Sequence, residues 1–177
     1  MMSIAAFVRL TELVQPPDFP VRANGDWKRF VSTNGFWPPE DYRMLVREYG
    51  SGLFADWLYL IEPFDPSISF TELVAAECRT LRNSSQRGPL WPEPGGFLPW
   101  AKTVTADHIG WRTDGRPENW TTVFWGHGGQ AVSEYPVSTV GFVLAVVERS
   151  LGPVAVNGSS ANPWPTVSTA SFQAAQG

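Results

Sequence analysis

The segment from Gly95 to Val147 constrains the fold most, because short apolar runs follow one another along it at close intervals. The runs are rich in Val, Thr, Phe and Trp, and Gly, Asp and Asn separate them, as is typical of consecutive antiparallel strands. Since the connections are short, each strand should pair with the next and form a β-meander. The predicted strands cover Phe97–Thr105, His108–Thr113, Trp120–Trp125 and Ala131–Pro136.

Amphipathic segments flank these strands. The clearest follows Pro38-Pro39 and places Tyr42, Leu45, Val46 and Tyr49 on one face of a helix that ends at Gly50. Further helices are predicted after Ser3, over Trp27–Thr33, from the Ser69/Glu72 capping box and over Ser138–Arg149, with another strand at Trp57–Ile61. Because Ser138–Arg149 is rich in β-branched residues, a buried strand is the alternative there.

These elements predict an α+β fold, with a mainly antiparallel sheet of five or six strands and helices packed largely on one side. The helix stripe and the strands should bury their apolar faces against each other, because neither has another apolar surface of comparable size. We therefore expect one core that includes Tyr42, Leu45, Tyr49, Leu60 and Phe97.

The chain divides into a central domain and two flanking pieces. Its 177 residues suit one domain, and 43% hydrophobic residues are ample for a core. We assign residues 1–25 to an N-terminal helix and Pro-rich lead-in, 26–151 to the α+β domain, and 152–177 to a tail rich in Gly, Ser and Pro. Trp164 or Phe172 is expected to pin this tail to the domain.

The net charge and the hydropathy of the chain restrict the kinds of molecule that it could bind. The net charge is −4 and no segment is strongly basic, which argues against direct nucleic-acid binding and favours a basic protein partner. No apolar run is long enough to span a bilayer. The first residues lack the pattern of a secretory signal, so we expect a cytoplasmic protein with no membrane partner.

Three motifs resemble one known family. They are Trp37-Pro38-Pro39-Glu40-Asp41-Tyr42 at a helix start, Tyr49-Gly50-Ser51-Gly52 at its end, and Phe97-Leu98-Pro99 at the start of the strands. In this order they resemble the SUKH superfamily over 26–151, although that family usually has Leu-Pro before the acidic residue and tyrosine. The resemblance implies a bacterial immunity protein that neutralises a toxin, often a nuclease, or a regulatory interaction module like the eukaryotic relatives.

The sequence contains only weak indications of a catalytic or metal site. His108, His127 and Cys78 lack zinc-site spacing, and no G-x-S-x-G or phosphate-binding loop is present. A Cys–His pair stays open, because such partners meet only in space, but Cys78 on the apolar side of a helix favours a core role. Asp107, Asp114, Glu118 and Glu134 fit either a carboxylate or cation site or solvated turns. We expect no enzyme activity, cofactor or metal.

The aromatic residues are the stronger indication of binding. Strand alternation places Trp120 and Phe124 on one face of their strand and Val123 and Trp125 on the other, so both faces are partly apolar. Either helices cover both faces, or one face keeps exposed Trp residues as partner anchors, with nearby carboxylates mimicking nucleic-acid phosphates. The predicted partner-binding residues are Trp111, Asp114, Glu118, Trp120, Trp125 and Glu134.

Overall fold

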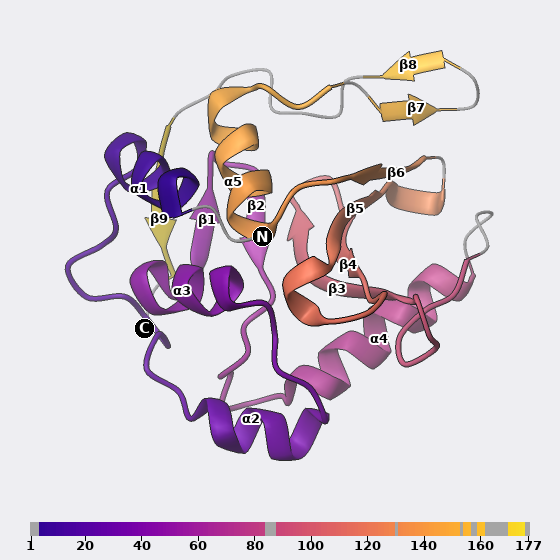
Figure 1. Ribbon diagram of the computed structural model, residues 1–177, viewed down its shortest axis with the longest axis horizontal. Coiled ribbons are helices and arrows are strands. Elements are labelled where there is room, and N and C mark those ends of the chain that lie inside the picture. Colours follow the sequence, from indigo (N-terminus) through magenta and orange to yellow (C-terminus); the bar gives the residue numbers. More distant parts are fainter. Residues whose placement is uncertain are drawn as a thin grey trace.

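The structure is a computed structural model that describes residues 4–83, 88–129, 131–152, 154–156, 159–161 and 170–175. Within these ranges, helices and an open antiparallel sheet form the predicted α+β fold (Figure 1). The helices are α1 (Ile4–Leu13), α2 (Trp27–Asn34), α3 (Glu40–Tyr49), α4 (Phe70–Arg82) and α5 (Thr139–Glu148). The strands are β1 (Gly52–Phe54), β2 (Leu58–Leu60), β3 (Phe97–Thr103), β4 (His108–Arg112), β5 (Thr121–Trp125), β6 (Val132–Tyr135), β7 (Val154–Val156), β8 (Ser159–Ala161) and β9 (Phe172–Ala174).

The main sheet has seven strands in the order β6-β5-β4-β3-β2-β1-β9, and β7 and β8 pair in a separate hairpin. Every neighbouring pair is antiparallel, and β1 to β6 follow chain order, which confirms the meander. The sheet exceeds the expected five or six strands because β1 and β9 join it at one edge. Each spans three residues, which is too short for a recognisable alternation.

Three helices begin at residues with capping side chains, while Ser3, before α1, lies outside the described residues. The Asp26 side chain accepts hydrogen bonds from the first-turn amides of α2, and Gly35 ends that helix in the left-handed region. Ser69 and Glu72 form the expected capping box at α4. Ser138 caps α5 by accepting from the Gly141 amide. Each predicted helix is therefore present, because its local signals agree with its packing.

Helices cover both faces of the sheet. Trp111 and His108 of β4 point to opposite faces, because they are three positions apart in a strand and side chains alternate between the faces. The Trp111 ring packs against Tyr42 of α3, and its indole donates to Thr139 of α5. The His108 imidazole instead lies against Glu77 of α4. So α3 and α5 pack on one face, with α1 against α5, while α4 covers part of the other (Figure 1).

The core is continuous and contains the predicted set. Tyr42, Leu45, Tyr49, Leu60 and Phe97 all belong to one buried cluster, as expected. Both tyrosine hydroxyls are satisfied inside it, since that of Tyr42 donates to the Ile61 carbonyl at 2.7 Å and that of Tyr49 to the Val14 carbonyl at 2.6 Å. The α3 stripe therefore joins the lead-in and the sheet in one body.

Replacing Leu45 by alanine should lower the free energy of unfolding by about 2–5 kcal/mol, because the removed side chain leaves a cavity in this core. Leu45 is fully buried on α3. Urea unfolding followed by circular dichroism measures the loss. A change well under about 1 kcal/mol would mean that the site collapses around the smaller side chain.

Both flanking pieces contact the central domain. In the lead-in, α1 packs against α5 and contributes Leu10 to the core. Within the tail, the β9 residue Phe172 packs against Tyr49 and Phe54, which confirms its expected pinning role. Trp164 lies outside the described residues. In the described part of the chain, every helix is too short or too polar to cross a membrane.

Candidate functional site

The three tryptophans predicted as partner anchors lie in the core. Trp111, Trp120 and Trp125 are 0%, 8% and 4% exposed, so the expectation that they form an exposed anchor is wrong. The reason is that helices cover both faces: Trp111 contacts α3 and α5, and Trp125 packs against Phe97 on the face that α4 covers. Of the two arrangements open from sequence, the covered sheet is the one adopted.

The three predicted acidic residues are exposed, but their surroundings differ. Asp114 and Glu118 lie on the connection between β4 and β5, which includes the 3-10 turn Pro117–Asn119. Glu134 of β6 accepts a hydrogen bond from Thr121 and pairs with Arg112 at 3.5 Å. These contacts lie on the face of the sheet that α4 partly covers. Glu134 is thus held by its neighbours on the sheet. A contribution of Asp114 and Glu118 to partner binding stays a prediction.

The candidate catalytic residues have structural surroundings. Burial raises the pKa of the Cys78 thiol to about 11, which keeps it protonated and a poor nucleophile at neutral pH. The Asp107 carboxylate accepts hydrogen bonds from Thr103, Thr105 and the amide of His127, and so fixes the turns at the ends of β3 and β5. Among the described residues, no cluster of three or more His, Cys, Asp or Glu side chains is arranged to hold a metal ion.

A partly buried polar cluster joins α4 to the sheet. The Oε2 atom of Glu77 lies 2.6 Å from Nε2 of His108, and Oε1 lies 3.0 Å from Nζ of Lys102. Nδ1 of His108 has no hydrogen-bond partner among the described residues. The hydrogen bond from His108, assisted by Lys102, holds the pKa of Glu77 below its ordinary value against the opposing effect of burial. The Glu77 carboxylate is therefore a structural clamp between helix and sheet.

The stabilising contribution of Glu77 should disappear in acid. A carboxyl with a lowered folded-state pKa stabilises fully above its ordinary value of 4.5 and loses that contribution as the pH falls through the folded value. The stability difference between the native protein and Glu77→Gln should therefore shrink between about pH 5 and pH 3. Urea unfolding across this range measures it, with exposed Glu93→Gln as the control. A difference that stays constant would contradict the clamp.

A hollow lies between α2 and the segment that leads into α4. It encloses about 660 Å³, with Phe30, Phe64 and Phe70 among its lining residues. Gly25 permits this arrangement, since a Cβ atom there would lie 2.1 Å from the Phe64 ring. Phe64 also packs edge-on against Trp27 with ring centroids 4.6 Å apart. Phe30 and Phe70 are only 4% and 3% exposed, so the partly exposed apolar side chains of the hollow include Phe64 and Ile68.

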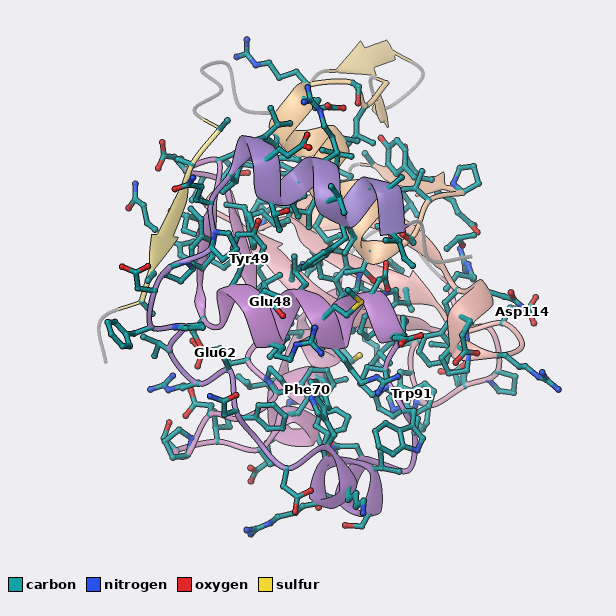
Figure 2. All side chains as sticks on the ribbon, turned by 60° about the vertical axis from the view of Figure 1, so that its left-hand side comes forward. Glu48, Tyr49, Glu62, Phe70, Trp91 and Asp114 are labelled. Atoms are coloured by element: carbon teal, nitrogen blue, oxygen red, sulfur yellow. The ribbon has the colours of Figure 1, made fainter. Side chains whose placement is uncertain are left out.

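A second, smaller hollow adjoins the first. It encloses about 190 Å³ and shares Thr33, Asn34 and Phe70 with its neighbour. Its walls add Phe36 and Trp91, whose ring centroids lie 5.1 Å apart. We call the two hollows together the α2–α4 groove. Figure 2 shows Phe70 and Trp91 in the lower part of the view.

The rim of the groove is acidic. Its lining includes the carboxylates of Asp26, Asp65 and Glu72 against the single guanidinium of Arg29. Hydrogen bonds from Ser67 lower the pKa of Asp65, and those from Ser69 lower the pKa of Glu72. All three carboxylates have structural partners, yet Asp65 and Glu72 remain ionised at neutral pH, so the rim carries net negative charge.

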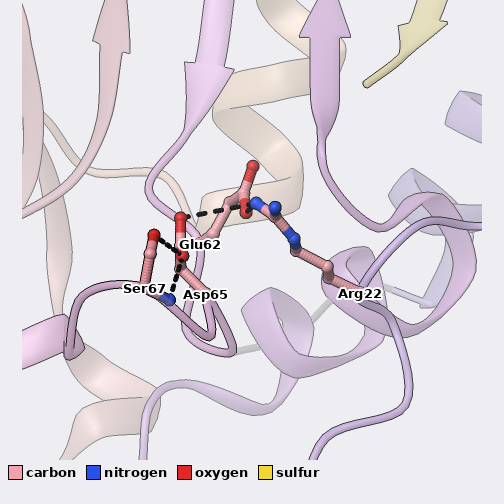
Figure 3. A network of polar contacts seen from close by, with 4 residues as sticks. All are labelled: Arg22, Glu62, Asp65 and Ser67. Carbon is pink, nitrogen blue, oxygen red and sulfur yellow. Dashed lines mark hydrogen bonds and ion pairs between the residues drawn. The ribbon is translucent and has the colours of Figure 1, made fainter. Parts of the chain in front are cut away.

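An ion-pair network stabilises one wall of the α2–α4 groove. Arg22 pairs with Glu62 and with Asp65 at 3.4 Å, and Asp65 accepts two hydrogen bonds from Ser67 (Figure 3). The network joins the Pro-rich lead-in to the loop between β2 and α4. Because these residues hold each other, the acidic rim is positioned before any partner arrives.

Sequence reasoning missed this groove. Phe30, Phe64 and Trp91 come from three separate segments, and no spacing rule brings them together. A usable indication was the density of Phe, Pro and Asp over 63–70, which is unusual for a plain connection. Comparisons with protein-family models, curated proteins and solved structures find no match for this chain.

Proposed function

We propose that this chain is a non-enzymatic protein that binds a basic partner protein on the α2–α4 groove. The observation that carries the proposal is the combination of the partly exposed Phe64 and Ile68 side chains with an acidic rim in one hollow. Partly exposed apolar side chains in a preformed hollow give a partner a contact surface, and a negative rim steers a basic partner toward it. The acidic rim agrees with the net charge of −4.

Within this class, toxin immunity is the finer proposal. It rests on the resemblance of the Trp37–Tyr42 and Phe97–Pro99 motifs to the SUKH superfamily. A nuclease toxin has a basic active-site cleft, which the acidic rim would complement. A regulatory interaction module of the same fold is the alternative, and it differs in having a cellular protein, not a toxin, as its partner.

The direct test is co-expression with the protein encoded by the neighbouring gene, which toxin immunity predicts to be a toxin. Co-expression should restore growth, and the two purified proteins should form a stable complex whose association slows as salt rises. A neighbouring protein that is neither toxic nor bound would contradict toxin immunity. A stable complex with a cellular protein in its place would support the regulatory alternative.

A matched pair of variants tests the groove itself. Ile68 lines the groove and is partly exposed, so Ile68→Arg should place a bulky cation on the surface that receives a basic partner. We expect a loss of affinity of about 30-fold or more, as at an interface hot spot. Val104→Arg is the control, because Val104 is 51% exposed on the turn after β3. Equal affinity of both variants would exclude the groove.

A further inference from the structure

The β1 edge of the sheet carries a strand that comes from far away in the sequence. β1 to β6 are consecutive along the chain, whereas β9 joins β1 after more than a hundred intervening residues. The pairing is antiparallel, with Gly52 opposite Ala174 and Phe54 opposite Phe172. Backbone amides of Ala55 and Ala175 donate to Ser171 and Ser51 at both ends of the pair. The contact is thus a strand addition to an existing edge.

The Phe172 side chain determines where β9 packs against the sheet. The Phe172 ring lies 4.7 Å from that of Phe54 and 5.2 Å from that of Tyr49, measured between centroids. A Cβ atom on Gly52 would lie 2.2 Å from the Phe172 ring, so only glycine leaves room for it. Phe54 and Tyr49 are fully buried, which makes the receiving surface part of the core. The edge therefore carries a preformed binding surface for an aromatic ring. We call this surface, formed by Tyr49, Gly52 and Phe54, the aromatic seat.

β9 itself contributes little else. It spans three residues, of which Gln173 and Ala174 are exposed and Phe172 is only partly buried. A strand held by a few backbone hydrogen bonds and one ring opens at a lower free energy than the core does. An open β1 edge exposes unpaired amides and carbonyls beside the vacated aromatic seat.

We propose that the β1 edge is a peptide-binding site for an extended segment with an aromatic residue followed two positions later by a small residue. The chain's own residues 171–175 are its resident ligand. Backbone pairing along β1 supplies general affinity, and the seat formed by Gly52, Tyr49 and Phe54 supplies the preference for an aromatic ring. An incoming segment of this pattern replaces β9. The site lies apart from the α2–α4 groove and does not depend on its function.

The test uses the full-length protein and a fluorescein-labelled peptide with the sequence of residues 170–177. Phe172→Asp places a carboxylate in the aromatic seat and should release β9. Because the tethered strand competes at a high effective concentration, the peptide should bind this variant at least about tenfold more tightly than the native protein. A peptide with alanine in place of phenylalanine should bind at least about tenfold more weakly. Fluorescence anisotropy measures each affinity.

Two further measurements keep the result decisive. Hydrogen exchange at the Ala55 amide should speed up in Phe172→Asp and slow again with peptide, because this amide donates to Ser171 in the resident pair. If Phe172→Asp does not fold, Ala175→Pro removes the donor to Ser51 and serves in its place. Equal binding to native and variant protein, binding that ignores the aromatic residue, or no binding to a folded variant would each overturn the proposal.

Discussion

Replacing Trp111 by alanine should lower the free energy of unfolding by about 3–5 kcal/mol, a large part of the stability of an ordinary domain. Its indole is fully buried on β4 and packs against Tyr42, Trp100 and Trp120, with ring centroids 5.0, 5.9 and 5.8 Å apart. The indole nitrogen also donates to the Thr139 hydroxyl at 3.0 Å. The substitution removes a large apolar volume and a buried hydrogen bond between sheet and α5 together.

Trp37 supplies the matched control. It is 43% exposed and its ring lies 5.0 Å from the Arg43 guanidinium. Trp37→Ala should cost no more than about 1 kcal/mol, because an exposed cation–π contact contributes about that much. Urea unfolding of both variants by circular dichroism measures the contrast. A Trp111→Ala variant as stable as Trp37→Ala would show that the sheet face is not packed as described.

The alternation of side chains along β4 and β5 could be predicted, but the choice between core and surface could not. Alternation separates Thr122 from Trp125 within β5, and the observed register, in which Trp111 pairs with Thr122 and Trp125 with His108, then puts Trp111 and Trp125 on opposite faces of the sheet. Whether a face is covered depends on where α4 packs. That position depends on tertiary contacts such as Glu77 with His108, which no local pattern encodes.

Elements with strong local signals were predictable, and sites built from several segments were not. The capping box at Ser69 and the stripe on α3 are contained within one helix each, so their sequence periods identify them. The α2–α4 groove instead needs Phe30, Phe64 and Trp91 to converge. Likewise, the three residues of β9 become a strand because β1 offers a free edge.

Asp41 illustrates the same distinction at a single residue. From sequence, Asp41 is one of two acidic residues, with Glu40, whose charge complements the positive N-terminal end of α3. In the fold it is 3% exposed, and its two carboxylate oxygens accept hydrogen bonds from different helices. Oδ1 accepts from the Tyr42 amide at 2.9 Å, and Oδ2 accepts from the Val140 amide at 2.9 Å. Asp41 of α3 therefore caps the first turn of α5.

Asp41→Ala should lower the free energy of unfolding by about 2–3 kcal/mol, because a hydrogen bond to a charged acceptor is lost and a buried amide of α5 is left without a partner. Glu40→Ala, one residue earlier and exposed, removes only a favourable charge at the end of the helix and should cost about 0.3–1 kcal/mol. Urea unfolding measures both losses, and hydrogen exchange at the Val140 amide localises the first. Exchange at Val140 that stays as slow in Asp41→Ala as in the native protein would mean that α5 is capped by another group.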